Sequence, residues 1–157
     1  MGKKIKNILF SLIIGCLFLG NISVSAAENN ILEIPQEKFN VVSTNNYEVA
    51  SSPVLSACVV GIGIADNGLH ITFDTTATQK ADEIGVKNVV IQEKTLFGWK
   101  DIPVSNYCTY NSDFYVGDII YTGAAKGTTY RVKCTHYAKF GSTELTLDNT
   151  SSEIVYN

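Results

Sequence analysis

Alternation of apolar residues at every second position dominates the chain from Pro53 onward. Such alternation places one side of an extended strand against a core and the other against solvent. The segments that show it are 58–64, 69–73, 86–94, 99–104, 114–122 and 128–138, and 143–148 with 152–156 closes the domain. About seven short strands separated by Gly, Asn and Asp turns predict an all-β, antiparallel β-sandwich of the fibronectin type III or immunoglobulin-like kind. Only 77–85 could instead form a helical turn.

Two short motifs support a sandwich. Asp66-Asn67-Gly68 stands between two alternating segments, and Asn and Gly tolerate positive φ, so a tight hairpin with Gly68 in a structural role is expected. Gly127-Thr128-Thr129-Tyr130 resembles the entry to the sixth strand of fibronectin type III domains. That resemblance implies a structural role for Tyr130, at a corner where its hydroxyl bonds to upstream backbone.

The first residues have the layout of a secretory signal peptide. Three lysines precede an apolar run from Ile8 to Gly20, and the small residues Val24-Ser25-Ala26 follow. We therefore expect a signal helix, cleavage after Ala26 and a secreted, extracellular protein without stable membrane insertion afterwards. A lipid anchor on Cys16 is the alternative, although the residues after Cys16 continue the apolar run.

The rest of the chain then divides into two parts. Residues 27–52 are rich in amides, Ser and acids, which predicts a flexible arm or linker that could add one edge strand. Residues 53–157 form the predicted sandwich domain, which we expect to be a monomer without a cofactor. Without the leader, nine basic residues stand against fifteen acidic ones. This negative balance argues against nucleic acid or anionic lipid as the main partner.

Three cysteines remain after the leader, so at most one disulfide and one leftover thiol are expected in an oxidising compartment. Cys58 and Cys134 fall on core-facing positions of predicted strands, whereas Cys108 lies in a loop-like tract. The sequence therefore predicts a Cys58–Cys134 disulfide between the two sheets and a free thiol at Cys108.

A reactive site is the alternative interpretation of the same region. Cys134 and His136 share one face of a strand, so they could serve a small thiol enzyme or, with Cys58 and Cys108, a metal protein. The chain has no Cys-x-x-Cys pair, and Cys-x-His on one strand is not a usual ligand spacing. We therefore predict neither a catalytic residue nor a metal site.

Aromatic residues mark two candidate surfaces. Phe97 and Trp99 flank Gly98 in a predicted turn; we expect Trp99 to be a structural core anchor, with a sugar-stacking platform as the alternative. A second cluster lies in a loop-like tract rich in Asn and Ser, a composition typical of adaptable recognition surfaces. Its members are Tyr107, Tyr110, Phe114 and Tyr115.

The domain also resembles a group of small secreted proteins of Gram-positive bacteria that share a domain of unknown function. The resemblance rests on the leader and on 69–73 with its preceding turn, 84–102, 121–144 and 147–149. It implies export and a sandwich fold but no reaction. We expect a secreted, non-catalytic recognition or interaction domain whose partner is an extracellular protein or a glycan. A secreted inhibitor or immunity-type protein is a further alternative.

Overall fold

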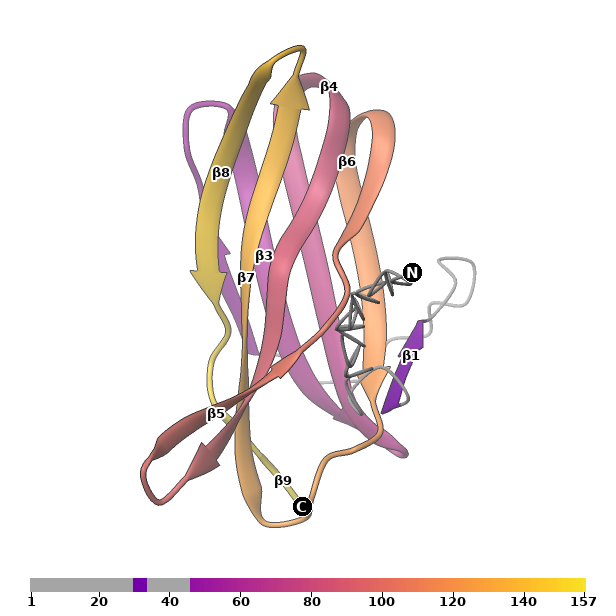
Figure 1. Cartoon of the computed structure of the whole chain (residues 1–157). Coiled ribbons are helices and arrows are strands. Elements are labelled where there is room, and N and C mark those ends of the chain that lie inside the picture. Colours follow the sequence, from indigo (N-terminus) through magenta and orange to yellow (C-terminus); the bar gives the residue numbers. More distant parts are fainter. Residues whose placement is uncertain (1–29, 34–45) are drawn as a thin grey trace, which may run out of the picture.

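The computed structural model describes residues 30–33 and 46–157, and its regular elements are all β-strands (Figure 1). The predicted signal peptide and the lipidation candidate Cys16 lie outside the described residues. The strands are β1 (Ile31–Glu33), β2 (Asn46–Ala50), β3 (Leu55–Ala65), β4 (Gly68–Thr95), β5 (Gly98–Pro103), β6 (Tyr107–Tyr121), β7 (Thr128–Phe140), β8 (Thr143–Thr150) and β9 (Ile154–Tyr156). All their pairings are antiparallel. The predicted all-β class is confirmed.

Two strands, β4 and β6, turn over at one end of the molecule and run through both layers of a sandwich (Figure 1). The register between them shifts between Thr76 and Ala81, where the two strands bend. The first half of β4 and the second half of β6 form one layer with β1, β2 and β3, which we call the back layer. The other halves form the front layer with β7 and β8, and β5 and β9 extend it.

Two expectations from the sequence differ from the observed sandwich. The described residues of the arm at 27–52 include two strands, where one edge strand was expected at most, because β1 pairs with β6 and β2 pairs with β3. The stretch 77–85, the one candidate for a helical turn, belongs to β4 and forms its bend. The residues on either side of this bend form backbone hydrogen bonds with β3, β6 and β7. A single helical turn could not satisfy as many of their backbone groups.

The main core lies between the layers and receives the alternating apolar residues of both. The back layer contributes Val60, Ile62, Leu69, Ile71, Phe73, Ile119 and Tyr121, and the front layer contributes Val86, Val89, Ile91, Ile102, Tyr130, Val132 and Cys134. Burying each large apolar side chain contributes about 1.5–3 kcal/mol. In the predicted strand 86–94, Val89 and Ile91 are the alternate apolar residues that point inward, and both are at most 1% exposed.

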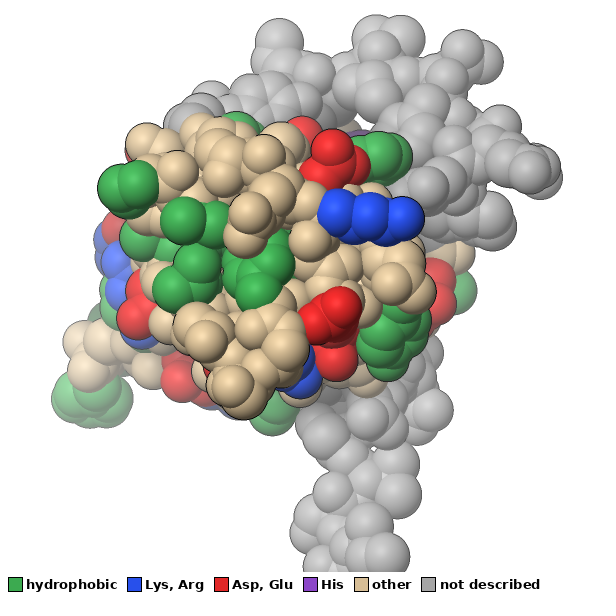
Figure 2. Space-filling view, turned by 90° about the horizontal axis from the view of Figure 1, so that it is seen from above, with side chains coloured by type: hydrophobic (Ala, Val, Ile, Leu, Met, Phe, Trp, Pro, Cys, Tyr) green, Lys and Arg blue, Asp and Glu red, His purple; other side chains and the backbone are tan. Residues whose placement is uncertain are grey.

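A second, smaller cluster closes the end at which β4 and β6 bend. It consists of Leu55, Cys58, Ala77, Ala81, Ile84 and Ala138, with Phe140 packed against it. Small alanines on both sides of the bend let the two layers approach here. Figure 2, which looks at this end from above, shows hydrophobic side chains in the middle of the face and mainly polar ones around them.

The predicted hairpin joins β3 to β4. Ala65 pairs with Gly68 across a two-residue turn, and Gly68 has a φ of 154°. A Cβ on Gly68 would lie 2.2 Å from the backbone oxygen of Tyr121 on the neighbouring strand β6. Glycine is therefore required both for the backbone conformation and for the close approach of β6.

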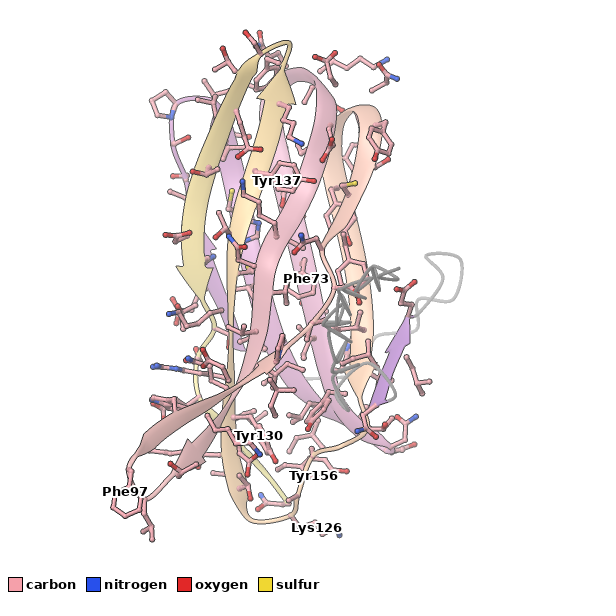
Figure 3. All side chains as sticks on the ribbon, in the orientation of Figure 1. Phe73, Phe97, Lys126, Tyr130, Tyr137 and Tyr156 are labelled. Carbon is pink, nitrogen blue, oxygen red and sulfur yellow. The ribbon has the colours of Figure 1, made fainter. Side chains whose placement is uncertain are left out.

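Tyr130 lies at the expected corner, at the start of β7. Its hydroxyl accepts a hydrogen bond from the backbone N–H of Ala125, at 3.0 Å. The ring is 1% exposed and meets Tyr121 edge to face, with 6.3 Å between the ring centres. This contact fixes the loop between β6 and β7 against the core (Figure 3).

Removing the corner hydroxyl should weaken the fold. We expect Tyr130→Phe to lower the free energy of unfolding by about 1–2 kcal/mol, because the Ala125 N–H loses its acceptor while the ring stays in place. Urea unfolding measures the change. Tyr156→Phe is the matched control, since Tyr156 packs on the same core. Equal losses in both variants would contradict the corner's role.

Candidate functional site

Cys134 and His136 form a contact, but in the interior of the sandwich. Cys134 is 4% exposed and His136 is 0% exposed, and Cys134 Sγ lies 3.5 Å from His136 Nε2. On the other side of the ring, His136 Nδ1 lies 2.7 Å from Thr75 Oγ1. Residues from β7 and from the back-layer half of β4 thus meet across the core.

The hydroxyl of Thr75 sets the direction of the hydrogen bonds. Thr75 Oγ1 donates its one proton to the backbone oxygen of Gly85 at 3.2 Å, so it must accept from His136 Nδ1–H. The unprotonated Nε2 is then left to accept from the Cys134 thiol. The chain of bonds runs in one direction, from thiol to imidazole to hydroxyl to backbone.

The protonation states of this pair oppose nucleophilic chemistry. Burial, together with the smaller effects of nearby Cys58 and Asp148, raises the pKa of the Cys134 thiol to about 12. Burial lowers the pKa of His136 to about 4. The neutral thiol and neutral imidazole are therefore strongly favoured over the thiolate and imidazolium that a thiol enzyme requires.

The three cysteines of the described chain are all thiols. The structure therefore does not contain the predicted Cys58–Cys134 disulfide. Both residues are buried and face the core as expected, but Cys134 Sγ is directed to His136, and Cys58 belongs to the separate end cluster. Cys108 is an exposed thiol that lies in strand β6, not in a loop. Among the described residues, no group of three or more His, Cys, Asp or Glu side chains is placed to hold a metal ion.

The predicted aromatic recognition surface is not assembled as one patch. Tyr115 packs against both core clusters, and its burial raises the pKa of its hydroxyl. Tyr107 is half-buried against the main core. Only Tyr110, 65% exposed, and Phe114, 54% exposed, reach the surface, on either side of the bend in β6.

Sequence analysis missed a buried tyrosine on the outer face of the front layer. Tyr137 pairs with Gly85, which pairs on its other side with Cys108, and Tyr137 Oη donates to Glu83 Oε1 at 2.5 Å. Lys87 Nζ and Lys139 Nζ lie 5.3 and 5.4 Å from the ring centre. Gly85 was the available signal: a Cβ there would lie 2.1 Å from the backbone oxygen of Tyr107 and 2.6 Å from Cys108 Cα, so a glycine within a strand marks the close approach of β6 at this point.

The hairpin between β4 and β5 is the most exposed apolar feature of the described chain (Figure 3). Leu96 is 97% exposed and Phe97 is 100% exposed at its two-residue tip. Thr95 Oγ1 accepts from the Phe97 N–H at 3.3 Å and donates to the Gly98 oxygen at 3.0 Å. The threonine thereby holds the turn in a conformation that directs both apolar side chains into solvent.

A ladder of polar contacts stiffens the base of this hairpin. Arg131 Nε donates to Gln92 Oε1 at 2.7 Å, and Gln92 Nε2 donates to Asp101 Oδ1 at 2.6 Å, which links β7, β4 and β5. The Arg131 guanidinium also lies 4.1 Å from the ring centre of Trp99. The expectation that Trp99 anchors the core is therefore wrong: Trp99 is half-buried on the outer face, opposite Lys94 in the hairpin.

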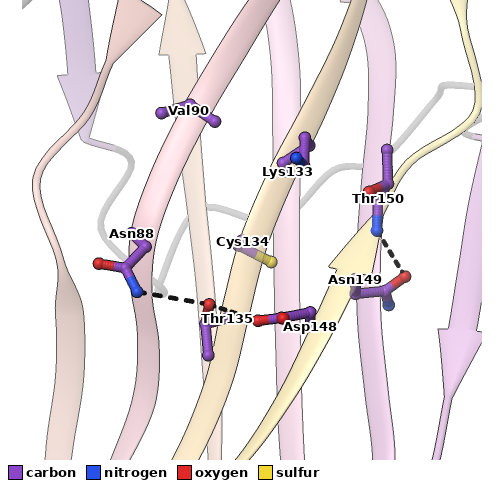
Figure 4. Close-up of a pocket in the computed structure, with 8 residues that line it drawn as sticks. All are labelled: Asn88, Val90, Lys133, Cys134, Thr135, Asp148, Asn149 and Thr150. Carbon is purple, nitrogen blue, oxygen red and sulfur yellow. Dashed lines mark hydrogen bonds between the residues drawn. The ribbon is translucent and has the colours of Figure 1, made fainter. Parts of the chain in front are cut away.

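A polar pocket of about 430 Å³ lies on the front layer, beside the strand β4 (Figure 4). Asn88, Val90, Lys133, Cys134, Thr135, Asp148, Asn149 and Thr150 line it. Asn88 has a φ of 52° at a bulge, where the register of β4 with β7 shifts between Lys87 and Val90. Such bulges redirect side chains, and this one places Asn88 beside Thr135.

Comparisons with protein-family models, curated proteins and solved structures find no match for this chain. The described residues also include no helix long and apolar enough to cross a membrane. The candidate sites therefore rest on their own geometry.

The buried histidine should make stability depend on pH. The pKa of His136 falls from 6.5 to about 4 on folding, so its contribution is complete above pH 6.5 and is lost as the pH falls towards 4. The expected loss in unfolding free energy is about 3 kcal/mol by pH 4. Urea unfolding of His136→Gln should show a correspondingly smaller pH dependence. An identical pH dependence in the variant would contradict this assignment.

Thiol reactivity should separate the three cysteines. We expect native protein at neutral pH to be alkylated at Cys108 only, because Cys108 is exposed while burial raises the pKa of Cys58 and of Cys134 to about 12. Peptide mapping by mass spectrometry measures each site, and unfolded protein, in which all three should react, is the control. Native alkylation of Cys134 as fast as Cys108 would show that the Cys134–His136 pair is accessible.

Proposed function

We propose that this protein is a secreted, non-catalytic recognition domain that binds a partner protein outside the cell. The observation that carries the proposal is the hairpin tip, where Leu96 and Phe97 are 97% and 100% exposed on a stiffened support. Adjacent large apolar side chains in solvent contribute nothing to the core, but they contribute strongly when a partner buries them. The leader-like pattern of the first residues supports a location outside the cell.

The preorganisation of the hairpin favours binding. The Thr95 turn and the Gln92–Asp101 contact fix the two strands, and Lys94 Nζ lies 3.0 Å from Glu153 Oε2 near the C-terminus. A partner would therefore spend little free energy on ordering the loop. Burial of both tip side chains could contribute about 3–6 kcal/mol to the complex.

The thiol alternative receives less support from the same molecule. Cys134 and His136 are buried, with a raised thiol pKa and a lowered imidazole pKa, so neither the nucleophile nor the base is in its reactive form. The inhibitor alternative uses the same hairpin, since an exposed, rigid loop also suits insertion into a partner's cleft. Stoichiometric binding of one secreted protein would favour this alternative.

Substitution of the tip should weaken recognition without affecting stability. We expect Leu96→Ser/Phe97→Ser to weaken binding to cells or secreted proteins of the producing species at least about tenfold, because both apolar anchors are lost. Binding of labelled protein measures the effect, and urea unfolding should give the wild-type midpoint.

Tyr110→Ser/Phe114→Ser is the matched control. It also removes two exposed large side chains, but from the bend of β6 at the opposite end of the sandwich (Figure 1). This control should bind like the wild type. Loss of binding in the control, with full binding by the tip variant, would assign recognition to the β6 bend and overturn the proposal.

A further inference from the structure

The pocket on the front layer combines opposite charges that do not neutralise each other. Lys133 and Asp148 line it from the neighbouring strands β7 and β8, and both are exposed. Within residues 30–33 and 46–157, Lys133 has no ion-pair or hydrogen-bond partner for its side chain. Asp148 accepts one hydrogen bond at Oδ1, from Thr135 Oγ1 at 2.7 Å.

Some lining groups are already used by the fold. Asn149 Nδ2 donates to the backbone oxygens of Glu48 and Cys58, at 3.2 and 3.0 Å, and Asn149 Oδ1 accepts from the Thr150 N–H. Thr135 Oγ1 donates to Asp148 and lies 3.5 Å from Asn88 Nδ2 (Figure 4). The hydrogen-bonding groups of Asn149 and Thr135 are therefore already used within the fold, and Thr135 holds the Asp148 side chain in place.

The groups left to meet a ligand are a mixture of donors and acceptors. Among the described contacts, Lys133 Nζ remains as a donor, and Asn88 Oδ1 and Asp148 Oδ2 remain as acceptors. The Thr150 hydroxyl remains as both. Val90 adds an apolar surface beside them.

The backbone at Asn88 supports a functional role for this arrangement. Its φ of 52° is uncommon for a residue other than glycine, although asparagine tolerates it better than most. Its N–H donates to Asn106 Oδ1 at 2.9 Å, so a side chain from beyond β5 holds the bulge in place. The bulge positions the Asn88 amide at the pocket.

We propose that this pocket binds a neutral saccharide unit. An anion would be opposed by Asp148, and a cation would be opposed by Lys133. A sugar hydroxyl satisfies both residues, because it donates to the carboxylate while it accepts from the ammonium. Asn88 and Thr150 can meet a second hydroxyl, and Val90 can contact the C–H face of the ring. The volume of about 430 Å³ is within the range of small-molecule sites.

The saccharide site does not depend on the proposed function of the hairpin. The pocket and the tip lie on different parts of the front layer and share no residue. Either surface could bind its ligand while the other does not.

Titration of the ¹⁵N-labelled protein with sugars tests the site. The probes are methyl glycosides of glucose, galactose and N-acetylglucosamine, with inorganic phosphate and ethanolamine as an anionic and a cationic probe. We expect at least one glycoside to give saturable amide shifts around Lys133, Asp148 and Thr150, with a Kd of about 1 mM, as suits a shallow polar site. Lys133→Met and Asp148→Asn should each weaken binding about tenfold.

Matched controls use a lysine and an aspartate that are exposed elsewhere. Lys126→Met and Asp113→Asn should bind like the wild type, as should Leu96→Ser/Phe97→Ser, whose failure in partner binding would concern only the hairpin. Saturable binding of phosphate or ethanolamine without any glycoside would overturn the proposed ligand class. Absence of saturable shifts with all three glycosides, or shifts confined to residues outside the pocket, would overturn the site.

Discussion

The backbone hydrogen bonds of β4 connect the two layers of this sandwich. Its 28 residues pair first with β3 and β6 in the back layer, and then with β6, β7 and β5 in the front layer. The same strand contributes Leu69 and Phe73 to the core from one side and Ile91 from the other. Because both layers share this strand, they cannot slide past each other without breaking its hydrogen bonds. The positions of the hairpin and of the pocket both follow from its second half.

Local signals predicted the features that depend on a few consecutive residues. The Asp66-Asn67-Gly68 hairpin and the Tyr130 corner were recognisable because each needs particular residue types at adjacent positions. Trp99 was misplaced for a different reason. It was expected in the core because sandwiches often bury a large aromatic anchor. Within β5, however, Ile102 faces the core, and Trp99 lies an odd number of positions before it, on the outer face, where it pairs with Lys94. The typical architecture of the fold was given more weight than the local alternation.

The tract around Tyr110 shows a second limit of sequence-based prediction. Tyr, Asn and Ser are common in recognition loops, but the same residues here form strand β6, whose partner is β4. Long-range pairing decides that Tyr115 enters the core while Tyr110 and Phe114 stay at the surface. Cys134 and His136 are two positions apart, and this spacing correctly predicted that both lie on one face of the strand. Their low reactivity follows from their burial in the core, because burial disfavours the charged form of each group.

The outer face of the front layer is built from polar contacts that run across strands. Arg131, Gln92 and Asp101 connect three strands near the hairpin, and Thr135 with Asp148 connects two strands at the pocket. Such contacts cost side-chain entropy and add little stability at a surface. They do, however, restrict the side chains and the hairpin to one arrangement before any ligand arrives. A ligand that binds a surface already ordered in this way pays a smaller entropic penalty. The contacts are therefore better explained by the need to hold the two proposed binding surfaces in shape than by the stability of the sandwich, whose apolar core lies on the other side of the sheet.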